Sequence, residues 1–334
     1  MKPERQFTEI ISLIRQARSD AYKAANTQLI NLYWSIGEYI SKRTESEGWG
    51  KATVQQLADY IQSNEPGATG FSDKNLWRMK QFYETYNDFP KLSPLVRELG
   101  WTNNLIILSR AKTAEEREFY LHLCIKEKYT SRELERQINA ATFEQLAIGN
   151  QKLSAVLRVF PQPVENVFKD TYVLDFLDLP EPYTEKNLQK AIIKNMKKFI
   201  LELGKDFLFM GEEYRVQVGN TDFFIDLVFF HRGLQCIVVF DLKTTQFKPE
   251  HLGQIGFYLE ALDRDVKKPY ENPSIGVLLC KDKDEEVVEY ALNRHLSPTL
   301  VSQYTNILPN KILLQAKLHE LYNLLGNKNY EEEI

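Results

Sequence analysis

Long apolar runs and paired cysteines are missing from this 334-residue sequence, and each absence excludes a class of protein. No apolar stretch approaches the roughly 20 residues of a membrane-spanning helix, and the first residues lack the hydrophobic core of a secretory signal. Cys124, Cys236 and Cys280 lie far apart within apolar stretches, which favours buried reduced thiols over disulfides or a zinc site. We therefore expect a cytoplasmic protein.

A strongly basic character is also missing, because the net charge is -4. The charge is uneven: residues 1–163 carry 22 basic and 19 acidic side chains (+3), and the remainder carries 20 and 27 (-7). If the chain contacts nucleic acid, local basic faces must do it. The hydrophobic fraction of 43% is typical of a globular protein, and the length suggests two domains.

Helical spacing of apolar residues dominates residues 1–150, which predicts an all-α N-terminal domain. Helices are expected over residues 7–43 (as one or two), 51–63, 72–86, and after Thr113 and Thr130, each with a glutamate at capping-box spacing. Ser72 is the expected N-cap of its helix. Residues 51–86 also have the length and turn of a helix-turn-helix.

Residues 151–184 are rich in turn formers and proline, which predicts a linker. Residues 185–334 then predict an α/β domain in the order helix, three strands, helix, strand. Its expected elements are a helix over 185–203, strands over 213–218, 222–230 and 234–242, a helix over 250–262 and a strand over 274–280. Hairpin spacing predicts that the first three strands pair antiparallel. The last strand requires a crossover and is expected to be parallel to its neighbour.

Two carboxylates interrupt this sheet where apolar residues are expected. Asp226 lies in the middle of a strand rich in Phe, Ile and Val, and Asp241 lies near the end of the next one. Burying an unpaired carboxylate costs several kcal/mol, so each acid needs a partner or a cation. Lys243 lies two residues after Asp241 and therefore on the same face of the strand. The sequence thus predicts two acids and one amine converging at the edge of the sheet.

Such a cluster suits metal-assisted phosphodiester hydrolysis. Hard oxygen ligands with few protein carboxylates favour Mg²⁺, or Mn²⁺ in its place, with the substrate phosphate as a further ligand. The metal would lower the pKa of a water, while the lysine positions that water and neutralises the phosphate. A plain buried salt bridge between Lys243 and either acid is the alternative.

A further signal lies on the next helix, where Gln254 and Tyr258 share a face at i, i+4 spacing. Together, Ile225-Asp226, Asp241-Leu242-Lys243-Thr244 and Gln254-Ile255-Gly256-Phe257-Tyr258 resemble the PD-(D/E)XK nuclease superfamily. Sequence segments outside this motif resemble the YhcG family, which has a DUF1016 N-terminal region. These segments are Leu32-Tyr33-Trp34-Ser35-Ile36-Gly37, Gly48-Trp49-Gly50-Lys51, Gly70-Phe71-Ser72-Asp73-Lys74-Asn75-Leu76-Trp77 and Phe247-Lys248-Pro249-Glu250.

The resemblance implies an α/β restriction-endonuclease-like core, with a mixed central sheet flanked by helices, that cuts DNA with a divalent metal. By it, Asp226 and Asp241 would be metal ligands and Lys243 the water-positioning lysine. Gln254 and Tyr258 would belong to the catalytic site, where they would either support the metal ligands or contact the substrate. Enzymes of this fold often cut two strands as dimers, so a homodimer is an expectation by analogy.

The chain departs from the family pattern at two positions. Family members carry a glutamate in the first helix of the domain where this chain has Gln189, and more often glutamate than aspartate at position 241. The metal-binding task of the missing helix acid could pass to Glu185, one turn earlier. Two hypotheses follow: a metal-dependent DNA endonuclease, structure-selective or not, in defence, repair or recombination, and a catalytically weakened nuclease fold that acts as a DNA-binding or assembly module.

Two basic helix faces are candidates for DNA contact. Lys186, Lys190 and Lys194 form a stripe on the first helix of the C-terminal domain, which Lys197 and Lys198 continue. Lys74 and Arg78 lie on one side of the second helix of the helix-turn-helix candidate, and phosphate contacts would suit them. An ordinary solvated helix face is the alternative in both cases.

Overall fold

The computed structural model describes residues 3–149, 152–158, 160–161, 164 and 167–320. The chain divides into two compact units, Met1–Ile138 and Asn139–Ile334. Among the described residues, no helix combines the length and apolar character needed to cross a membrane. Cys124, Cys236 and Cys280 are buried and form no disulfide with one another, and their burial confirms the expectation from the sequence.

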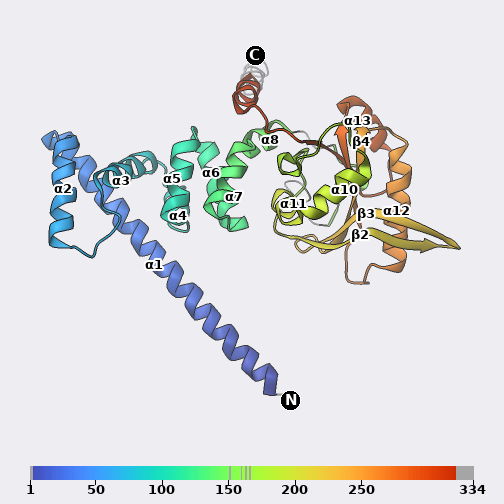
Figure 1. Ribbon diagram of the computed structural model, residues 1–334, viewed down its shortest axis with the longest axis horizontal. Coiled ribbons are helices and arrows are strands. Elements are labelled where there is room, and N and C mark those ends of the chain that lie inside the picture. Colours follow the sequence, from blue (N-terminus) through green and yellow to red (C-terminus); the bar gives the residue numbers. More distant parts are fainter. Residues whose placement is uncertain (1–2, 150–151, 159, 162–163, 165–166, 321–334) are drawn as a thin grey trace, which may run out of the picture. The chain divides into compact units, whose positions relative to one another are not determined.

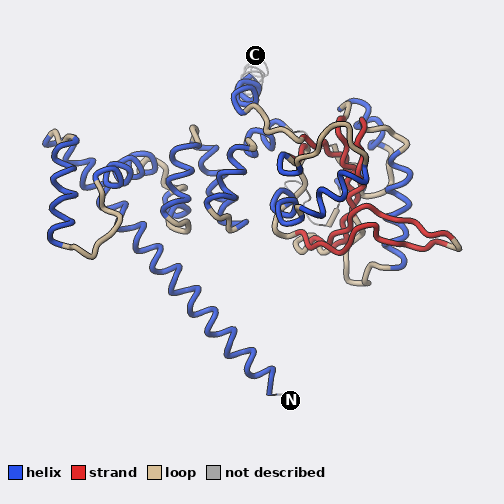
Figure 2. The backbone as a smooth tube through the Cα atoms, viewed as in Figure 1, coloured by secondary structure: helices blue, strands red, loops and turns tan. Residues whose placement is uncertain are grey.

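The first unit consists of helices, as predicted (Figures 1 and 2). They are α1 (Pro3–Glu47), α2 (Lys51–Asn64), α3 (Asp73–Tyr86), α4 (Ser93–Val96), α5 (Trp101–Arg110), α6 (Ala114–Glu127) and α7 (Ser131–Asn139). The predicted helical stretch at the start is one continuous helix rather than two. It packs on α3 at Gly37, where a Cβ atom would lie 2.2 Å from the carbonyl oxygen of Met79. Only glycine allows this close approach of the two helices.

Polar side chains begin the helices where the sequence predicts. Ser72 accepts a hydrogen bond from the N–H of Asn75 at 3.3 Å. Thr130 and Glu133 form the reciprocal pair of a capping box, with the N–H of Thr130 donating to the Glu133 carboxylate at 2.7 Å. At the other expected box, Thr113 accepts from the N–H of Glu116 as predicted, but the Glu116 carboxylate accepts from residue 112 instead.

The second unit contains a six-stranded mixed sheet in the order β1-β6-β5-β4-β3-β2. Its elements are α8 (Thr142–Ile148), α9 (Ala155–Arg158), β1 (Thr171–Val173), the 3-10 helix η1 (Asp175–Leu177), α10 (Glu185–Lys194), α11 (Met196–Leu203), β2 (Phe207–Val218), β3 (Thr221–His231), β4 (Cys236–Gln246), α12 (His251–Asp265), β5 (Ile275–Asp282), α13 (Glu285–Asn293) and β6 (Thr299–Thr305). Residues 311–320 form a further helix. The antiparallel pairing of β2, β3 and β4 and the parallel pairing of β4 with β5 confirm the predictions.

Each face of the sheet is covered by helices with their own apolar cluster. On one face, Phe229 and Phe240 pack with Leu188 of α10 and Phe199 of α11. On the other face, the sheet packs against α12 and α13. An α/β architecture with a mixed central sheet between helical layers is therefore the observed fold of the second unit, preceded by an all-helical unit.

The single helix predicted over 185–203 is wrong, because the chain leaves the helical conformation at Asn195 (φ -112°, ψ 26°). The Asn195 side chain donates to the carbonyl oxygen of Ala191 at 3.1 Å. The N–H of Asn195 donates to the same carbonyl oxygen. Asparagine side chains favour such local bonds to the backbone at helix ends, so α10 ends and α11 begins there.

Residues 151–184, for which proline predicts a linker, are structured in part. Thr171–Val173 form β1, which pairs parallel to β6 at one edge of the sheet. Strand β6 and helix α13 were not predicted from the sequence.

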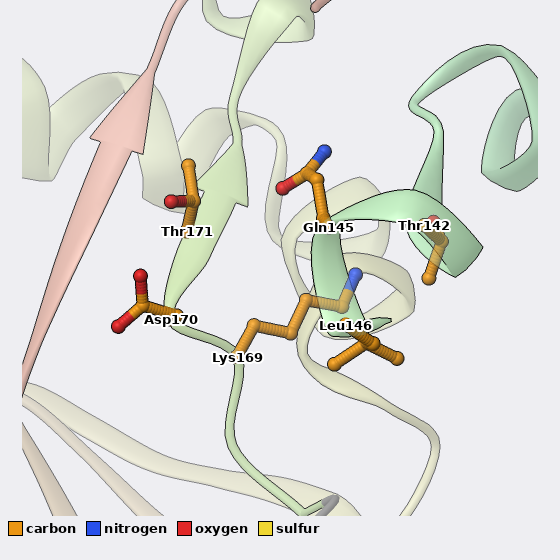
Figure 3. A pocket seen from close by; sticks show the side chains of 6 residues that line it. All are labelled: Thr142, Gln145, Leu146, Lys169, Asp170 and Thr171. Atoms are coloured by element: carbon orange, nitrogen blue, oxygen red, sulfur yellow. The ribbon is translucent and has the colours of Figure 1, made fainter. Parts of the chain in front are cut away.

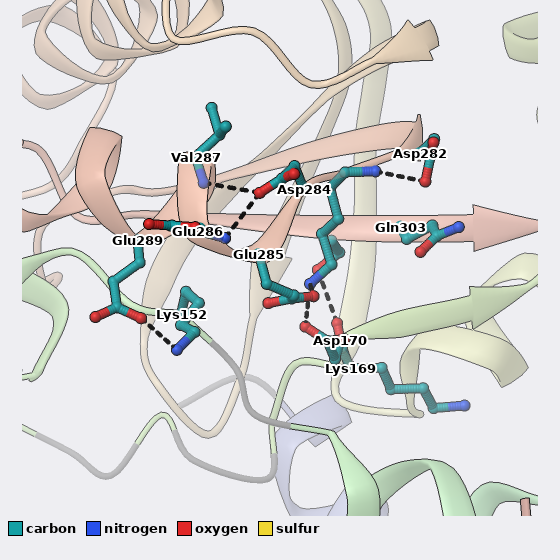
Figure 4. Close-up of polar contacts among 12 residues, drawn as sticks. Lys152, Lys169, Asp170, Asp282, Asp284, Glu285, Glu286, Val287, Glu289 and Gln303 are labelled. Carbon is teal, nitrogen blue, oxygen red and sulfur yellow. Dashed lines mark hydrogen bonds and ion pairs between the residues drawn. The ribbon is translucent and has the colours of Figure 1, made fainter.

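Ion pairs connect the segments around β1, β5 and α13 at this edge of the sheet. Lys283, whose side chain is buried, pairs with Asp170 and, at 3.0 Å, with Glu285. Nearby, Lys152 pairs with Glu289 of α13 at 2.6 Å (Figure 4). In the same view, Asp284 caps α13 by accepting from the N–H groups of residues 286 and 287. Each of these lysines is paired with a carboxylate. We therefore interpret these ion pairs as interactions that stabilise the edge of the sheet.

A small pocket of about 10 Å³ lies between α8 and the start of β1 (Figure 3). Its lining comprises Thr142, Gln145 and Leu146 of α8 with Lys169, Asp170 and Thr171. None of the carboxylates that the sequence predicts for catalysis lines it.

Candidate functional site

The predicted acidic cluster lies where two strands of the sheet separate. The β3–β4 ladder runs from His231 paired with Cys236 to Leu227 paired with Phe240. Before Leu227, β3 pairs with β2 alone, and the two strands extend as a hairpin beyond the sheet (Figure 1). Asp226 is therefore the first residue past the end of the ladder. Its Oδ2 accepts a hydrogen bond from the N–H of Leu242 on β4 at 2.8 Å.

A change of face in β3 coincides with this position. Ile225 belongs to the apolar cluster beneath α12, whereas Leu227 belongs to the cluster beneath α10 and α11. In a regular strand, residues two apart share a face, so the chain turns over around Asp226. This local turn, together with the end of the ladder, brings the Asp226 carboxylate to β4.

Asp241 and Lys243 share one face of β4, as their spacing predicts. The Lys243 Nζ lies 2.9 Å from Asp241 Oδ2 and 3.9 Å from Glu185 Oε2. Asp241 and Lys243 are buried, whereas Glu185 is partly exposed at the first position of α10. The structure thus brings Glu185 to the same lysine as Asp241.

The cluster contains more carboxylates than positively charged groups, and the pKa shifts of its members reflect this excess. Burial raises the pKa of Asp226 to about 6, and the Asp241 and Glu185 charges add to that rise against the Leu242 hydrogen bond and the Lys243 charge. Burial also raises the pKa of Asp241, although Lys243 opposes the rise. Burial alone would lower the pKa of Lys243, but the neighbouring carboxylates more than reverse this. With all groups ionised, three carboxylates face one ammonium group.

The residues present fit a divalent cation. Asp241 Oδ2 is buried, and among the described residues the contact found for it is the Lys243 ammonium group at 2.9 Å. Two buried carboxylates and one at the rim supply hard oxygen donors of the kind that Mg²⁺ prefers, and Mg²⁺ keeps several waters rather than a full protein cage. Within the described part of the chain, no three His, Cys, Asp or Glu side chains already form a metal-binding group. The fit is therefore one of charge and donor chemistry.

Gln189 lies beside the cluster without contributing a charge. It is buried, and its Nε2 donates to the backbone oxygen of Asp226 at 2.9 Å. Gln189 thus holds the backbone of Asp226 from the side of α10. Glu185, one turn earlier, supplies the carboxylate on this helix.

Gln254 and Tyr258 share a face of α12, as predicted, and hydrogen-bond to each other at 2.7 Å. Tyr258 is buried in the apolar cluster beneath α12, and Gln254 is exposed. Their observed contact joins the two residues rather than linking either one to the carboxylates.

His251 is a neighbour of the cluster that the sequence reasoning missed. Burial and the Lys243 charge lower its pKa, and the Glu185 charge opposes this, so the first turn of α12 lies within electrostatic reach of the site. Its Nδ1 accepts from the N–H of Lys248 at 3.2 Å. The signal was available, because His251, Gln254 and Tyr258 follow one another at i, i+3 and i+7 on one helix face.

The basic residues predicted to contact DNA are exposed on two separate helices. Lys186, Lys190 and Lys194 lie on the side of α10 away from its buried residues. Lys186 pairs with Glu213 of β2 at 3.5 Å, and Lys190 and Lys194 face solvent. Lys74 and Arg78 are exposed on α3.

Comparison with known proteins accounts for nearly the whole chain. Residues 165–319 match the YhcG PDDEXK nuclease domain, and residues 9–145 match the DUF1016 N-terminal domain. The chain belongs to the YhcG/DUF1016 family. Its second unit therefore carries a nuclease domain of the PD-(D/E)XK type, and the charged cluster described above lies in that domain. The Escherichia coli (strain K12) protein YhcG is 29% identical over 351 aligned positions, which cover 92% of each chain.

Similarity between this YhcG/DUF1016 family member and solved structures is remote. A repair endonuclease from Pyrococcus abyssi is 15% identical over 39% of this chain and 50% of its own, with a TM-score of 0.25. A complex of EndoMS with dsDNA is 14% identical over 40% of this chain and 49% of its own, also with a TM-score of 0.25. The matches thus span about half the length of those chains.

Proposed function

We propose that this protein is a divalent-metal-dependent DNA endonuclease that hydrolyses phosphodiester bonds at the cluster of Asp226, Asp241 and Lys243. The supporting observation is the charge imbalance of that cluster, in which Asp226, Asp241 and Glu185 surround one lysine in a partly buried position. Buried charges without compensation are strongly unfavourable, and a divalent cation would provide the compensation. The nuclease domain of the family supplies the chemical context.

Each residue has a definite task in this proposal. Asp226 and Asp241 hold Mg²⁺ or Mn²⁺. Glu185 takes the place of the helix carboxylate that the family pattern has at the position of Gln189. Bound there, the metal would supply a Lewis acid for the scissile phosphate and its attacking water. The neighbouring carboxylates raise the pKa of Lys243, so its Nζ stays protonated near neutral pH. It therefore donates a hydrogen bond to the water or the phosphate and balances the growing negative charge.

Contacts to the DNA backbone complete the proposal. Lys186, Lys190 and Lys194 on α10 begin one residue after Glu185, so a strand held by them would pass close to the acidic cluster. Lys74 and Arg78 on α3 would contact phosphates through the helical domain, residues 1–150. Cytoplasmic defence, repair or recombination are the settings that this activity fits.

A plasmid cleavage assay with Mg²⁺, Mn²⁺ or EDTA tests the proposal. We expect wild-type protein to cut only with metal, and the Asp241→Asn and Lys243→Met variants to cut at least about 100-fold more slowly, as when one transition-state contact is lost. Lys248→Met is the matched control, because Lys248 is an exposed lysine of the same domain that pairs with Glu250 at 3.7 Å. This control should keep the wild-type rate. Equal cleavage by the Lys243→Met variant would place the chemistry elsewhere.

The second candidate is a nuclease fold that binds DNA without cutting it. Gln189 favours this function, because the family resemblance implies a glutamate at this position, whereas the amide of Gln189 donates to the Asp226 backbone oxygen. Linear, supercoiled, branched and single-stranded DNA should be compared in the same assay. Retained binding without metal-dependent cutting of any of these substrates would support the second candidate.

A further inference from the structure

The N-terminal part of α1 carries an apolar stripe that the described residues of the helical unit leave uncovered. Every residue from Phe7 to Ala25, called the arm below, is exposed. Burial of α1 begins at Ile30, where the helix packs on the helical unit. Figure 1 shows this part of α1 running on beyond α2 and α3. Large apolar side chains at its end are exposed to solvent: Phe7 is 63% exposed, Ile10 55% and Ile14 47%.

An unsupported helix with such a stripe needs a partner. Helices in proteins draw most of their stability from packing an amphipathic face rather than from intrinsic propensity. The arm has its stripe at alternating steps of three and four residues, through Phe7, Ile10, Ile14, Ala17, Ala21 and Ala24. This is the spacing of the a and d positions of a coiled coil.

We propose that the arm pairs with the arm of a second copy of this chain in antiparallel orientation. The stripe is divided by size, with large residues in its first half and alanines in its second half. In an antiparallel pair centred between Ile14 and Ala17, each layer combines one large residue with one alanine. The layers are Phe7 with Ala24, Ile10 with Ala21, and Ile14 with Ala17 of the other copy. Such alternation of large and small residues across facing positions fills a helix interface evenly.

A parallel pair would pack this stripe poorly. Phe7 would meet Phe7, and each alanine would meet its own counterpart, so the helices would be held apart at one end and leave gaps at the other. Voids and overpacking both lower stability. Beside the stripe, Arg18 would lie next to Ile11 of the other copy, where its aliphatic stem can cover apolar surface, and Asp20 would lie next to Leu13 at the solvent-facing edge of the pair. Like charges therefore do not meet.

The mass of the full chain in solution tests the pairing. We expect wild-type protein to sediment at twice its 39.1 kDa chain mass. The Ile14→Asp variant should weaken the dimer at least about 100-fold, because each interface would bury unpaired carboxylates. Ser12→Asp is the matched control, since Ser12 is exposed on the opposite side of the helix and receives the same charge. It should remain dimeric. Both substituted positions are exposed in the single chain, and circular dichroism should confirm unchanged helix content.

Two results would overturn the pairing. One is a wild-type protein that stays monomeric at high concentration, as expected if the arm packs on its own chain. The other is an Ile14→Asp variant with the wild-type dissociation constant. DNA cleavage is not measured in either experiment, so the result is separate from the nuclease proposal.

Disulfide formation between single-cysteine variants tests the orientation. The Phe7→Cys and Ala24→Cys variants should cross-link with each other when mixed and oxidised, and each should cross-link little by itself. The native cysteines are buried and provide the background control when wild-type protein is oxidised. Efficient self-linking of the Phe7→Cys variant would establish a parallel pair and rule out the proposed one.

Discussion

Asp226 is the residue at which the proposed function and the stability of the fold conflict. It lies past the end of the β3–β4 ladder, with one hydrogen bond from Leu242 and other carboxylates nearby. Burial raises its pKa to about 6, which means that the folded protein without metal resists its ionisation. A cation at the cluster would relieve this strain, so the proposed metal ligand destabilises the metal-free fold.

We expect Asp226→Asn to stabilise the metal-free protein at neutral pH. The folded pKa is about 6 and the unfolded value is about 4. Between these values the folded state binds more protons, so the contribution of Asp226 to stability is retained at low pH and lost as pH rises. The variant lacks this titration, and its amide oxygen can still accept from Leu242. Its advantage over wild type should grow from about pH 4 to pH 7, to at most about 3 kcal/mol.

Urea unfolding in EDTA across this pH range measures the difference. Asp222→Asn serves as control, because Asp222 is an exposed aspartate on the same strand, paired with Arg215 at 2.9 Å. Its effect should stay within about 0.5 kcal/mol. An advantage of Asp226→Asn that does not change with pH would contradict the assignment.

The three residues at the centre of the site were predictable because they violate a local pattern. An acid within an apolar strand is an anomaly that the sequence displays directly, and the period of a strand places Lys243 beside Asp241. His251 gave a much weaker signal, because a histidine in the first turn of a helix is unremarkable until that helix is known to pack over the site. Glu185 could be proposed only as a substitute for the position that Gln189 occupies.

The strands of the sheet were predictable to different degrees. Strands β3 and β4 are rich in Val, Ile and Phe and stood out. Strand β6, Thr299–Thr305, carries Thr, Ser and Gln among its apolar residues and was missed, although most of it is buried. Its burial depends on β5 and β1 flanking it, and β1 comes from a proline-rich segment. Such non-local pairing leaves little trace in a short window of sequence.

The lysine stripe of α10 should determine DNA affinity independently of base sequence. We expect Lys190→Ala and Lys194→Ala each to weaken binding of any duplex and to lower the slope of log affinity against log salt by about 1, as for the loss of one phosphate contact. Lys268→Ala is the control, because Lys268 is exposed in the loop that precedes β5. Fluorescence anisotropy at several salt concentrations measures both quantities. An unchanged slope would make the stripe an ordinary solvated face.

Because the chain divides into two compact units, we expect two unfolding transitions. The helical unit ends at Ile138 and the unit with the sheet begins at Asn139. The proposed metal ligands Asp226 and Asp241 both belong to the second unit. A ligand stabilises only the folding unit that binds it, so metal binding should affect the two transitions differently.

We expect Mg²⁺ to raise the unfolding temperature of the second unit and to leave that of the first unchanged. At 100 times its dissociation constant, a ligand contributes about 2.7 kcal/mol, which corresponds to roughly 5 to 10 °C for a unit of this size. Calorimetry of the full chain, with and without Mg²⁺, resolves the two shifts. The Asp241→Asn variant should lose the Mg²⁺-dependent shift, whereas Lys248→Met should keep it. Equal shifts of both transitions, or a full shift in Asp241→Asn, would show that Mg²⁺ acts outside the proposed cluster.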